Sequence, residues 1–218
     1  MTSLHNQRMT DIILYDYWRS SASYRVRIAL NLKGVAYTAI NTNLLDGNHK
    51  AKDYIARNPQ GLVPTLSIDG HDLTQSLAII DYLDAKYDDP PMVSGDPAER
   101  ANTLAQALVV AADIHPVNNL QILKYLKNEL GQDQDAIDNW YRHWIETGFV
   151  ALEAMAPENG LFGGEKPNLA DVCLVPQMYN ARRFKTDVTA FPKLVRIDAA
   201  CNQLEAFQKA TPEAVKED

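Results

Sequence analysis

The sequence predicts an α/β domain followed by an all-α domain, and three observations support this prediction. In the first half, short apolar segments and helical patterns alternate in the order β-α-β-α-β-β-α. Residues 88–91, Asp-Asp-Pro-Pro, are typical of a linker. After Asp96 only long helical patterns follow, without strand candidates. We therefore place an α/β domain at residues 11–90 and a helical domain at residues 97–212.

The elements of the first half follow from hydrophobic spacing and turn residues. The first helix has an apolar face with Arg25 and Arg27 set against it, and Gly34 ends it. Asp69 and Gly70 are a strong hairpin signal. A β-α-β start requires a parallel strand pair with a right-handed crossover, so we expect a mixed sheet. The predicted strands are residues 12–17, 36–44, 62–68 and 71–74, and the predicted helices are 24–33, 51–57 and 76–87.

The second half is predicted to be entirely helical. Asn168 and Asp171 resemble an N-capping box. Cys173 and Cys201 lie on apolar helix faces and are predicted core residues. The polar tail from Pro212 onward is expected to be loose. The predicted helices are residues 97–130, 134–155, 168–181 and 193–210.

Composition narrows the classes of function. The 218 residues carry 28 acidic and 21 basic side chains, a net charge of −7, which disfavours nucleic acid or an anionic membrane as partner. No apolar run is long enough to span a membrane. Two cysteines make neither a disulfide framework nor a zinc site, so we expect no metal. The first eleven residues lack the apolar core of a signal peptide, which favours a reducing, cytoplasmic location.

A serine-rich junction, residues 19–23 (Arg-Ser-Ser-Ala-Ser), lies between the first strand and the first helix. A serine here is an ordinary N-cap. The same position also suits an anion, because free backbone N–H groups and the positive end of the helix dipole meet there. A thiolate is such an anion. The junction has no cysteine, so sulfur chemistry at this place requires a sulfur that arrives on a ligand.

Two further sites allow a structural and a functional interpretation. Pro64 either simply opens a strand or follows Val63 in a cis bond that exposes the Val63 backbone to an extended peptide ligand. Ser76, preceded by Gln75, is either an N-cap or part of a second helix N-terminus that binds a carboxylate.

Residues 20–30, Ser-Ser-Ala-Ser-Tyr-Arg-Val-Arg-Ile-Ala-Leu, resemble the Ser-Ser-Cys-x-x-Arg-Val-Arg-Ile-Ala-Leu signature of zeta-class glutathione transferases, the family of maleylacetoacetate isomerases. The resemblance covers about residues 11–210. Ala22 stands in place of the signature cysteine and Tyr24 in place of a common tryptophan. Further segments that match in place and order are residues 58–66, 75–80, 115–120, 168–177 and 181–184.

The resemblance implies a thioredoxin-like N-terminal domain, a helical C-terminal domain, a homodimer and glutathione as cofactor. It also implies cis–trans isomerisation of maleylacetoacetate in tyrosine and phenylalanine catabolism. The alternatives are a maleylpyruvate isomerase, a transferase acting on small electrophiles, and a non-catalytic module that binds a partner protein. Maleylpyruvate enzymes often carry an arginine pair after Asn-Asn, whereas Leu120 and Gln121 stand here, which favours maleylacetoacetate.

The resemblance also implies individual roles. Ser20 and Ser21 are the predicted catalytic residues, with the Ser20 hydroxyl on the glutathione thiolate. Val63, followed by a cis Pro64, is expected to hold the cysteinyl part of glutathione through its backbone. The full set of implied glutathione contacts is Ser20, Ser21, Ala22, Ser23, Tyr24, Arg25, His49, Val63, Pro64, Gln75, Ser76, His115, Asn119, Leu120 and Gln121.

The chemistry assigns the remaining tasks. A thiolate that adds to a cis double bond makes it single, rotation follows, and loss of the thiolate leaves the trans form. A small dicarboxylic keto acid needs arginines, for which Arg19 and Arg183 are predicted, with Arg182 as a substitute. Arg25 and Arg27 are expected to form structural pairs. His115 is either structural or a donor in the cleft, with a charge that switches near neutral pH.

Overall fold

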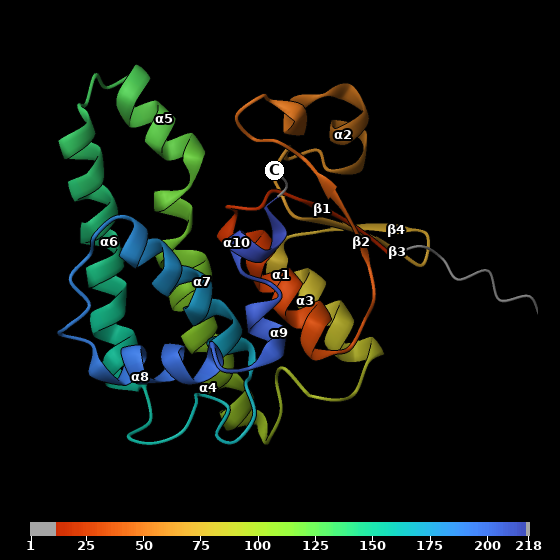
Figure 1. Cartoon of the computed structure of the whole chain (residues 1–218), viewed down its shortest axis with the longest axis vertical. Helices are drawn as coiled ribbons and strands as arrows, with labels where there is room; N and C mark the ends of the chain where they lie inside the picture. Colours follow the sequence, from red (N-terminus) through yellow and green to blue (C-terminus); the bar gives the residue numbers. More distant parts are fainter. Residues whose placement is uncertain (1–11, 217–218) are drawn as a thin grey trace, which may run out of the picture.

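The computed structural model describes residues 12–216. Its four-stranded sheet has the order β2-β1-β3-β4 (Figure 1). β1 (Ile13–Asp16) runs parallel to β2 (Thr38–Asn41) and antiparallel to β3 (Thr65–Ile68), which pairs antiparallel with β4 (His71–Thr74). The predicted mixed sheet is confirmed.

The β3–β4 hairpin turns at Asp69 and Gly70. Both residues have left-handed φ angles, 53° and 80°. Two consecutive positive φ values are what a two-residue type I′ turn requires, and its twist matches that of the strands. The predicted hairpin is confirmed.

The helices of the first half are α1 (Ser21–Leu32), the 3₁₀ turn η1 (Asn48–Lys50), α2 (Lys52–Arg57) and α3 (Ser76–Lys86). α1 begins three residues earlier than predicted because Ser20 caps it. α1 packs against α3 and against the helical half through α7 (Figure 1).

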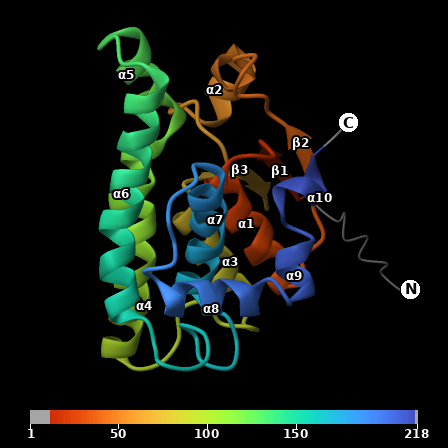
Figure 2. The ribbon, with the colours of Figure 1, turned by 60° about the vertical axis from the view of Figure 1, so that its left-hand side comes forward.

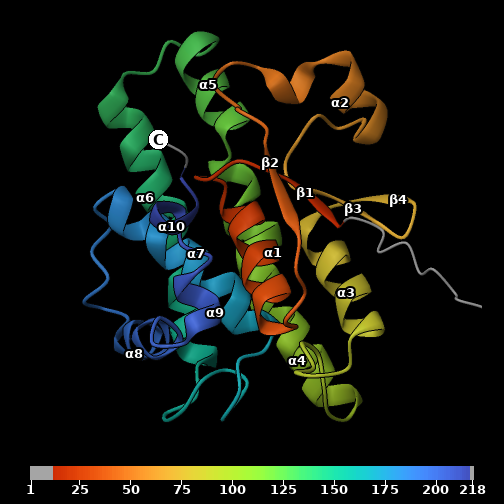
Figure 3. The ribbon, with the colours of Figure 1, turned by 45° about the vertical axis from the view of Figure 1, so that its right-hand side comes forward.

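The polar positions of α1 do not face solvent, contrary to the simple amphipathic pattern. Arg27 is 0% exposed, and its Nη1 atom donates to both carboxylate oxygens of Asp16 at 2.8 and 2.7 Å. Its Nε atom donates to the carbonyl of Ala210 at 2.9 Å, next to α9, which lies against α1 (Figure 3). Helices on several sides bury α1, so its arginines are enclosed. The predicted structural pair of Arg27 is confirmed.

The second half is helical, and α6 runs along the side of the molecule away from the sheet (Figure 2). The predicted helix 97–130 is interrupted, because Pro116 has no N–H to continue the ladder. The predicted helix 193–210 is split as well. The elements are α4 (Pro97–Leu108), the π-helix η2 (Val109–Ile114), the 3₁₀ turn η3 (Pro116–Asn118), α5 (Leu120–Asn128), α6 (Gln134–Met155), α7 (Leu169–Arg183), α8 (Pro192–Cys201) and α9 (Glu205–Gln208).

The chain end is more ordered than predicted. Residues from Pro212 form the short helix α10 (Pro212–Val215), with Thr211 as its N-cap and Pro212 buried. Residues 217–218 of the predicted loose tail, and the predicted leader at residues 1–11, lie outside the described residues.

One hydrophobic core joins both halves, from Leu14 in the sheet to Phe149 on α6. Asn168 accepts hydrogen bonds from the N–H groups of Ala170 and Asp171, and the Asp171 carboxylate accepts from the Asn168 N–H at 2.9 Å, so the predicted capping box is confirmed. Both cysteines are buried in this core without a disulfide, as predicted.

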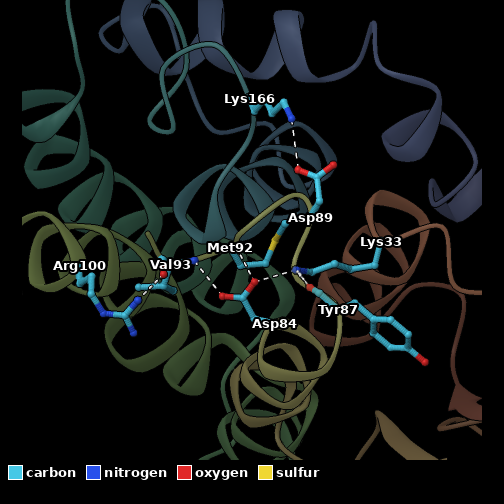
Figure 4. A network of polar contacts seen from close by, with 8 residues as sticks. All are labelled: Lys33, Asp84, Tyr87, Asp89, Met92, Val93, Arg100 and Lys166. Carbon is cyan, nitrogen blue, oxygen red and sulfur yellow. Dashed lines mark hydrogen bonds and ion pairs between the residues drawn. The ribbon is translucent and has the colours of Figure 1, made fainter. Parts of the chain in front are cut away.

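The segment between the halves is held in place by Asp84. The Asp84 carboxylate accepts from the backbone N–H groups of Met92 at 2.7 Å and Val93 at 3.1 Å, and from Lys33 at 2.7 Å (Figure 4). The Met92 carbonyl accepts from the N–H of Leu169 at 2.9 Å. The predicted linker is thus a fixed connection, while the domain boundaries stay a prediction. None of the helices in residues 12–216 is long and apolar enough to cross a membrane.

Candidate functional site

A cavity of about 450 Å³ opens between the β1–α1 junction and the helical half. Its volume falls in the range of small-ligand sites. Among its lining residues are ten of those that the sequence singled out. These are Arg19, Ser20, Ser21, His49, Val63, His115, Asn119, Leu120, Gln121 and Arg183.

Ser20 lies at the start of α1, on the cavity. It has extended backbone angles (φ −72°, ψ 117°), and its Oγ accepts the Ser23 N–H at 3.2 Å. Its hydroxyl proton has no acceptor within the described part of the chain. Because the helix dipole also favours negative charge here, Ser20 is both a structural N-cap and a donor available to an anion.

Ser21 and His115, both in the cavity lining, join the two halves of the molecule. Ser21 Oγ lies 3.1 Å from His115 Nδ1. Loss of solvent, reinforced by the positive charge of Arg25, lowers the pKa of His115 to about 3. The prediction that its charge switches near neutral pH is therefore wrong. His115 is a neutral hydrogen-bonding group at physiological pH.

The charged residues of the lining are cations. They are Arg19, Lys50, Lys124 and Arg183, and no aspartate or glutamate lines the cavity. Arg182 forms an ion pair with Asp198, so it does not substitute for its neighbour. A cationic cavity in a chain of net charge −7 is selective for anions, because the local field dominates over the net charge.

His49 lines the cavity on the turn η1 and is buried, with an Nδ1 atom that has no hydrogen-bond partner in residues 12–216. Desolvation lowers its pKa, and the charges of Lys50 and Lys124 lower it further. His49 is thus neutral and able to bind a ligand.

The Val63–Pro64 bond is cis. Val63 lines the cavity and Pro64 is buried behind it, at the entry to β3. The predicted cis bond is confirmed, whereas the backbone pairing of Val63 with a ligand stays a prediction.

Gln75 and Ser76 are not part of the cavity lining. The prediction of Ser76 as N-cap is wrong, because Gln75 holds that position with a positive φ of 67°. A non-glycine residue in this region is strained, and such strain is frequent at ligand sites. Ser76 accepts a hydrogen bond from Arg25 Nη1 at 3.1 Å, and Gln75 donates to Gln60 at 2.8 Å.

The structure does not bring the four residues that follow Ser21, residues 22–25, to the cavity. Ala22, Ser23, Tyr24 and Arg25 are buried, and none of them lines it. The prediction that these four residues contact glutathione therefore stays a prediction. Within residues 12–216 Arg25 forms no ion pair, contrary to the prediction of a structural pair. The reason is the same in each case: the residues lie on faces of α1 that pack against other helices.

Several lining residues were not predicted, namely Tyr17, Leu44, Leu45, Lys50, Asn118, Lys124, Tyr141 and Asn180. Asn118 lies inside a matched segment and was within reach of sequence analysis. Tyr141 lies in the middle of α6, where nothing in the local sequence separates a cavity residue from a core residue. In the part of the chain that the structure describes, no cluster of His, Cys, Asp and Glu is suited to a metal ion.

The model of the glutathione S-transferase N-terminal domain matches residues 10–85. The maleylacetoacetate isomerase of Rhizobium meliloti (strain 1021) is 48% identical over 209 residues, which are 94% of this chain and 98% of that protein. The chain belongs to the zeta-class glutathione transferase family. Membership confirms the predicted thioredoxin-like N-terminal domain and helical C-terminal domain.

Two solved structures are similar over nearly their whole length. The holo structure of a maleylpyruvate isomerase, a bacterial zeta-class enzyme, has a TM-score of 0.92 and 43% identity and covers 94% of this chain and 99% of its own. A maleylacetoacetate isomerase from Methylobacterium extorquens AM1, with bound malonate and glutathione, has a TM-score of 0.90 and 35% identity and covers 94% and 98%.

Proposed function

We propose that this chain is a glutathione-dependent isomerase that converts maleylacetoacetate to fumarylacetoacetate in tyrosine and phenylalanine catabolism. One observation carries the proposal. The cavity combines a serine hydroxyl at a helix N-terminus with four cations and no carboxylate. This combination suits a thiolate together with a dianionic keto acid.

The residues present fit glutathione, a tripeptide with two carboxylates and a thiol. The Ser20 proton and the His49 Nδ1 atom have no partner in the described chain, and Lys50 and Lys124 supply positive charge to the same cavity. The similar enzyme from M. extorquens was solved with glutathione, which supports the same cofactor here.

When bound, glutathione supplies a thiolate that adds to the cis double bond and leaves after rotation about the resulting single bond, so that it is returned unchanged. Ser20 donates a hydrogen bond that stabilises the anionic sulfur, and the N-terminal end of α1 adds its dipole. Neutral His115 holds Ser21 and links the helical half to this end of α1.

Arg19 and Arg183 hold the substrate carboxylates. Both line the cavity and are exposed to solvent there. Neither has a carboxylate partner in residues 12–216, since the Arg19 guanidinium stacks on Trp18 at 4.4 Å and that of Arg183 on Phe184 at 4.7 Å. The planar forks thus remain available for bidentate binding.

The first test is Ser20→Ala. We expect the pKa of the bound thiol, followed by thiolate absorbance in the ultraviolet, to rise, and kcat to fall about 10²-fold, as for the loss of one stabilising donor. Isomerisation is expected only in the presence of glutathione.

The control for Ser20→Ala is Asp96→Ala, which removes the N-cap of α4 away from the cavity. Both variants are expected to lose about 1 kcal/mol of stability. Only Ser20→Ala is expected to change the thiol. Unchanged thiol ionisation and turnover in Ser20→Ala would contradict the assignment of Ser20.

Maleylpyruvate is the second candidate substrate, because the similar holo structure with a TM-score of 0.92 is that of a maleylpyruvate isomerase. The two substrates differ in length beyond the ketone. The ratio of kcat/KM for the two, measured on the same preparation, decides between them, and we expect maleylacetoacetate to give the larger value. Transfer of glutathione to small electrophiles is the expected side activity.

A homodimer in the cytoplasm completes the proposal. The family implies the dimer, and light scattering of the purified chain measures it directly. A monomeric mass at micromolar concentration would contradict it.

A further inference from the structure

We propose that Tyr141 is a second catalytic hydroxyl of this cavity, which donates a hydrogen bond to the carbonyl oxygen of the substrate beside Arg183. This inference rests on the proposed function. It adds a residue that acts on the substrate rather than on the thiol.

The first support is the position of Tyr141. It lies on α6, is 4% exposed, and still lines the cavity. Tyr141 therefore forms part of the cavity wall although it is almost fully buried. Arg183 reaches the same space from α7.

The second support is that Tyr141 is held in place without a ligand. Its ring stacks on Phe184 at a centroid distance of 3.5 Å and an interplanar angle of 10°. Its backbone carbonyl accepts from Asn118 Nδ2 at 3.0 Å. The Arg183 guanidinium lies over the same Phe184 ring. Donors fixed in advance need little reorganisation during a reaction.

The third support is the state of the hydroxyl. Arg183 only donates hydrogen bonds, so in its contact with Tyr141 the hydroxyl oxygen accepts. The Tyr141 proton then has no acceptor within residues 12–216, whereas the hydroxyl of Tyr54 donates to the Leu62 carbonyl at 2.5 Å. Burial raises the pKa of Tyr141 to about 12, against the opposing charge of Arg183, so the group is a donor at neutral pH.

The substrate has one oxygen that suits the Tyr141 hydroxyl as hydrogen-bond donor, namely its carbonyl oxygen. As the sulfur–carbon bond forms, the electron pair of the double bond moves toward the conjugated carbonyl oxygen, and it returns when that bond breaks. Nothing is oxidised or reduced, and no proton has to leave the substrate. Arg19 and Arg183 already match the permanent charges of the carboxylates. A neutral hydroxyl beside a cation favours an oxygen that gains charge only during the reaction.

The test is Tyr141→Phe, which keeps the stacked ring. We expect kcat to fall about 10²- to 10³-fold, with KM within about threefold of wild type. The glutathione affinity and the pKa of the bound thiol are expected to stay unchanged. The control is Tyr82→Phe, whose hydroxyl contacts Asp69 on the surface hairpin and which should leave all of these values unchanged.

Calorimetry with malonate in the presence of glutathione gives a readout independent of turnover. Malonate has two carboxylates and no ketone. We expect its affinity to stay within about twofold in Tyr141→Phe and to fall at least about tenfold in Arg183→Gln, the loss expected for a charge-assisted pair.

Two results would overturn the role of Tyr141 while leaving the proposed function intact. One is an unchanged kcat, or a raised KM at constant kcat, in Tyr141→Phe. The other is a loss of malonate affinity in Tyr141→Phe as large as that in Arg183→Gln. If instead the wild-type chain isomerises neither substrate, the proposed function itself fails.

Discussion

Two arginines, Arg25 and Arg27, lie two residues apart on α1 and are both buried, yet their surroundings differ. Arg27 donates to Asp16, to the Ala210 carbonyl and to the Trp18 carbonyl. Arg25 makes a single hydrogen bond, to Ser76, and its Nε and Nη2 atoms have no partner in the described chain.

The difference indicates that Arg27 serves the stability of the fold, whereas we expect Arg25 to serve the ligand site. A buried cation with every guanidinium nitrogen hydrogen-bonded is a structural element, and the Arg27 network joins Ala210 to α1 and β1. A buried cation with unpaired donors costs stability, and burial lowers the pKa of Arg25. Arg25 donates to Ser76, and its charge lowers the pKa of His115, which lines the cavity, so we expect its field to reach the ligand site.

The largest effect is expected for Arg27→Met. This change leaves the Asp16 carboxylate buried without its partner, so the free energy of unfolding should fall by about 3–5 kcal/mol, measured by denaturant titration. Glutathione affinity of the folded fraction should not change. Arg57→Met, at an exposed pair with Asp72, is the control and should cost less than about 1 kcal/mol. A loss of less than about 1 kcal/mol in the free energy of unfolding of Arg27→Met would contradict the structural role of Arg27.

Arg25→Met is expected to show the reverse pattern. Stability should stay within about 1 kcal/mol of wild type, since only one hydrogen bond is lost. Glutathione affinity, measured by calorimetry, should fall about tenfold, or about 1.4 kcal/mol, because the positive charge beside the site is gone. A loss of stability equal to that of Arg27→Met, with affinity unchanged, would show that both arginines are structural.

The effect that is smallest at neutral pH concerns His115, because it develops only in acid. Its pKa is lowered from 6.5 to about 3 in the folded chain. Between these two values the unfolded chain binds a proton that the folded chain does not, so stability falls as the pH drops, by at most about 1.4 kcal/mol per pH unit. His115→Gln should flatten the stability curve between pH 6.5 and 3. An identical slope in the variant would show that His115 is accessible to protons in the fold.

The sequence predicted the strands, the hairpin and the position of Ser20 and Ser21 on the cavity, because these depend on local features. Serines between a strand and a helix usually cap the helix. An Asp-Gly pair between two strands usually forms a hairpin turn. The helix break at Pro116 was also within reach, since proline cannot continue the backbone ladder.

Local sequence patterns did not predict which polar side chains are buried. Amphipathic spacing assumes that one helix face meets water, and α1 is enclosed, so the paired state of Arg27 and the unpaired state of Arg25 depend on helices distant in the sequence. The lowered pKa of His115 and the cavity position of Tyr141 have the same origin. Both follow from which residues of the other half come to lie beside them.

The backbone anchored by Asp84 has a consequence for ligand selection. Met92 and Val93 are tied to the end of α3, and Met92 is tied to the start of α7, so the joint between the halves does not act as a hinge. The cavity between the β1–α1 junction and the helical half is therefore framed by elements that are joined to each other. A ligand is then accommodated by the side chains that line the cavity, such as the exposed Leu45, and not by a change in the angle between the halves.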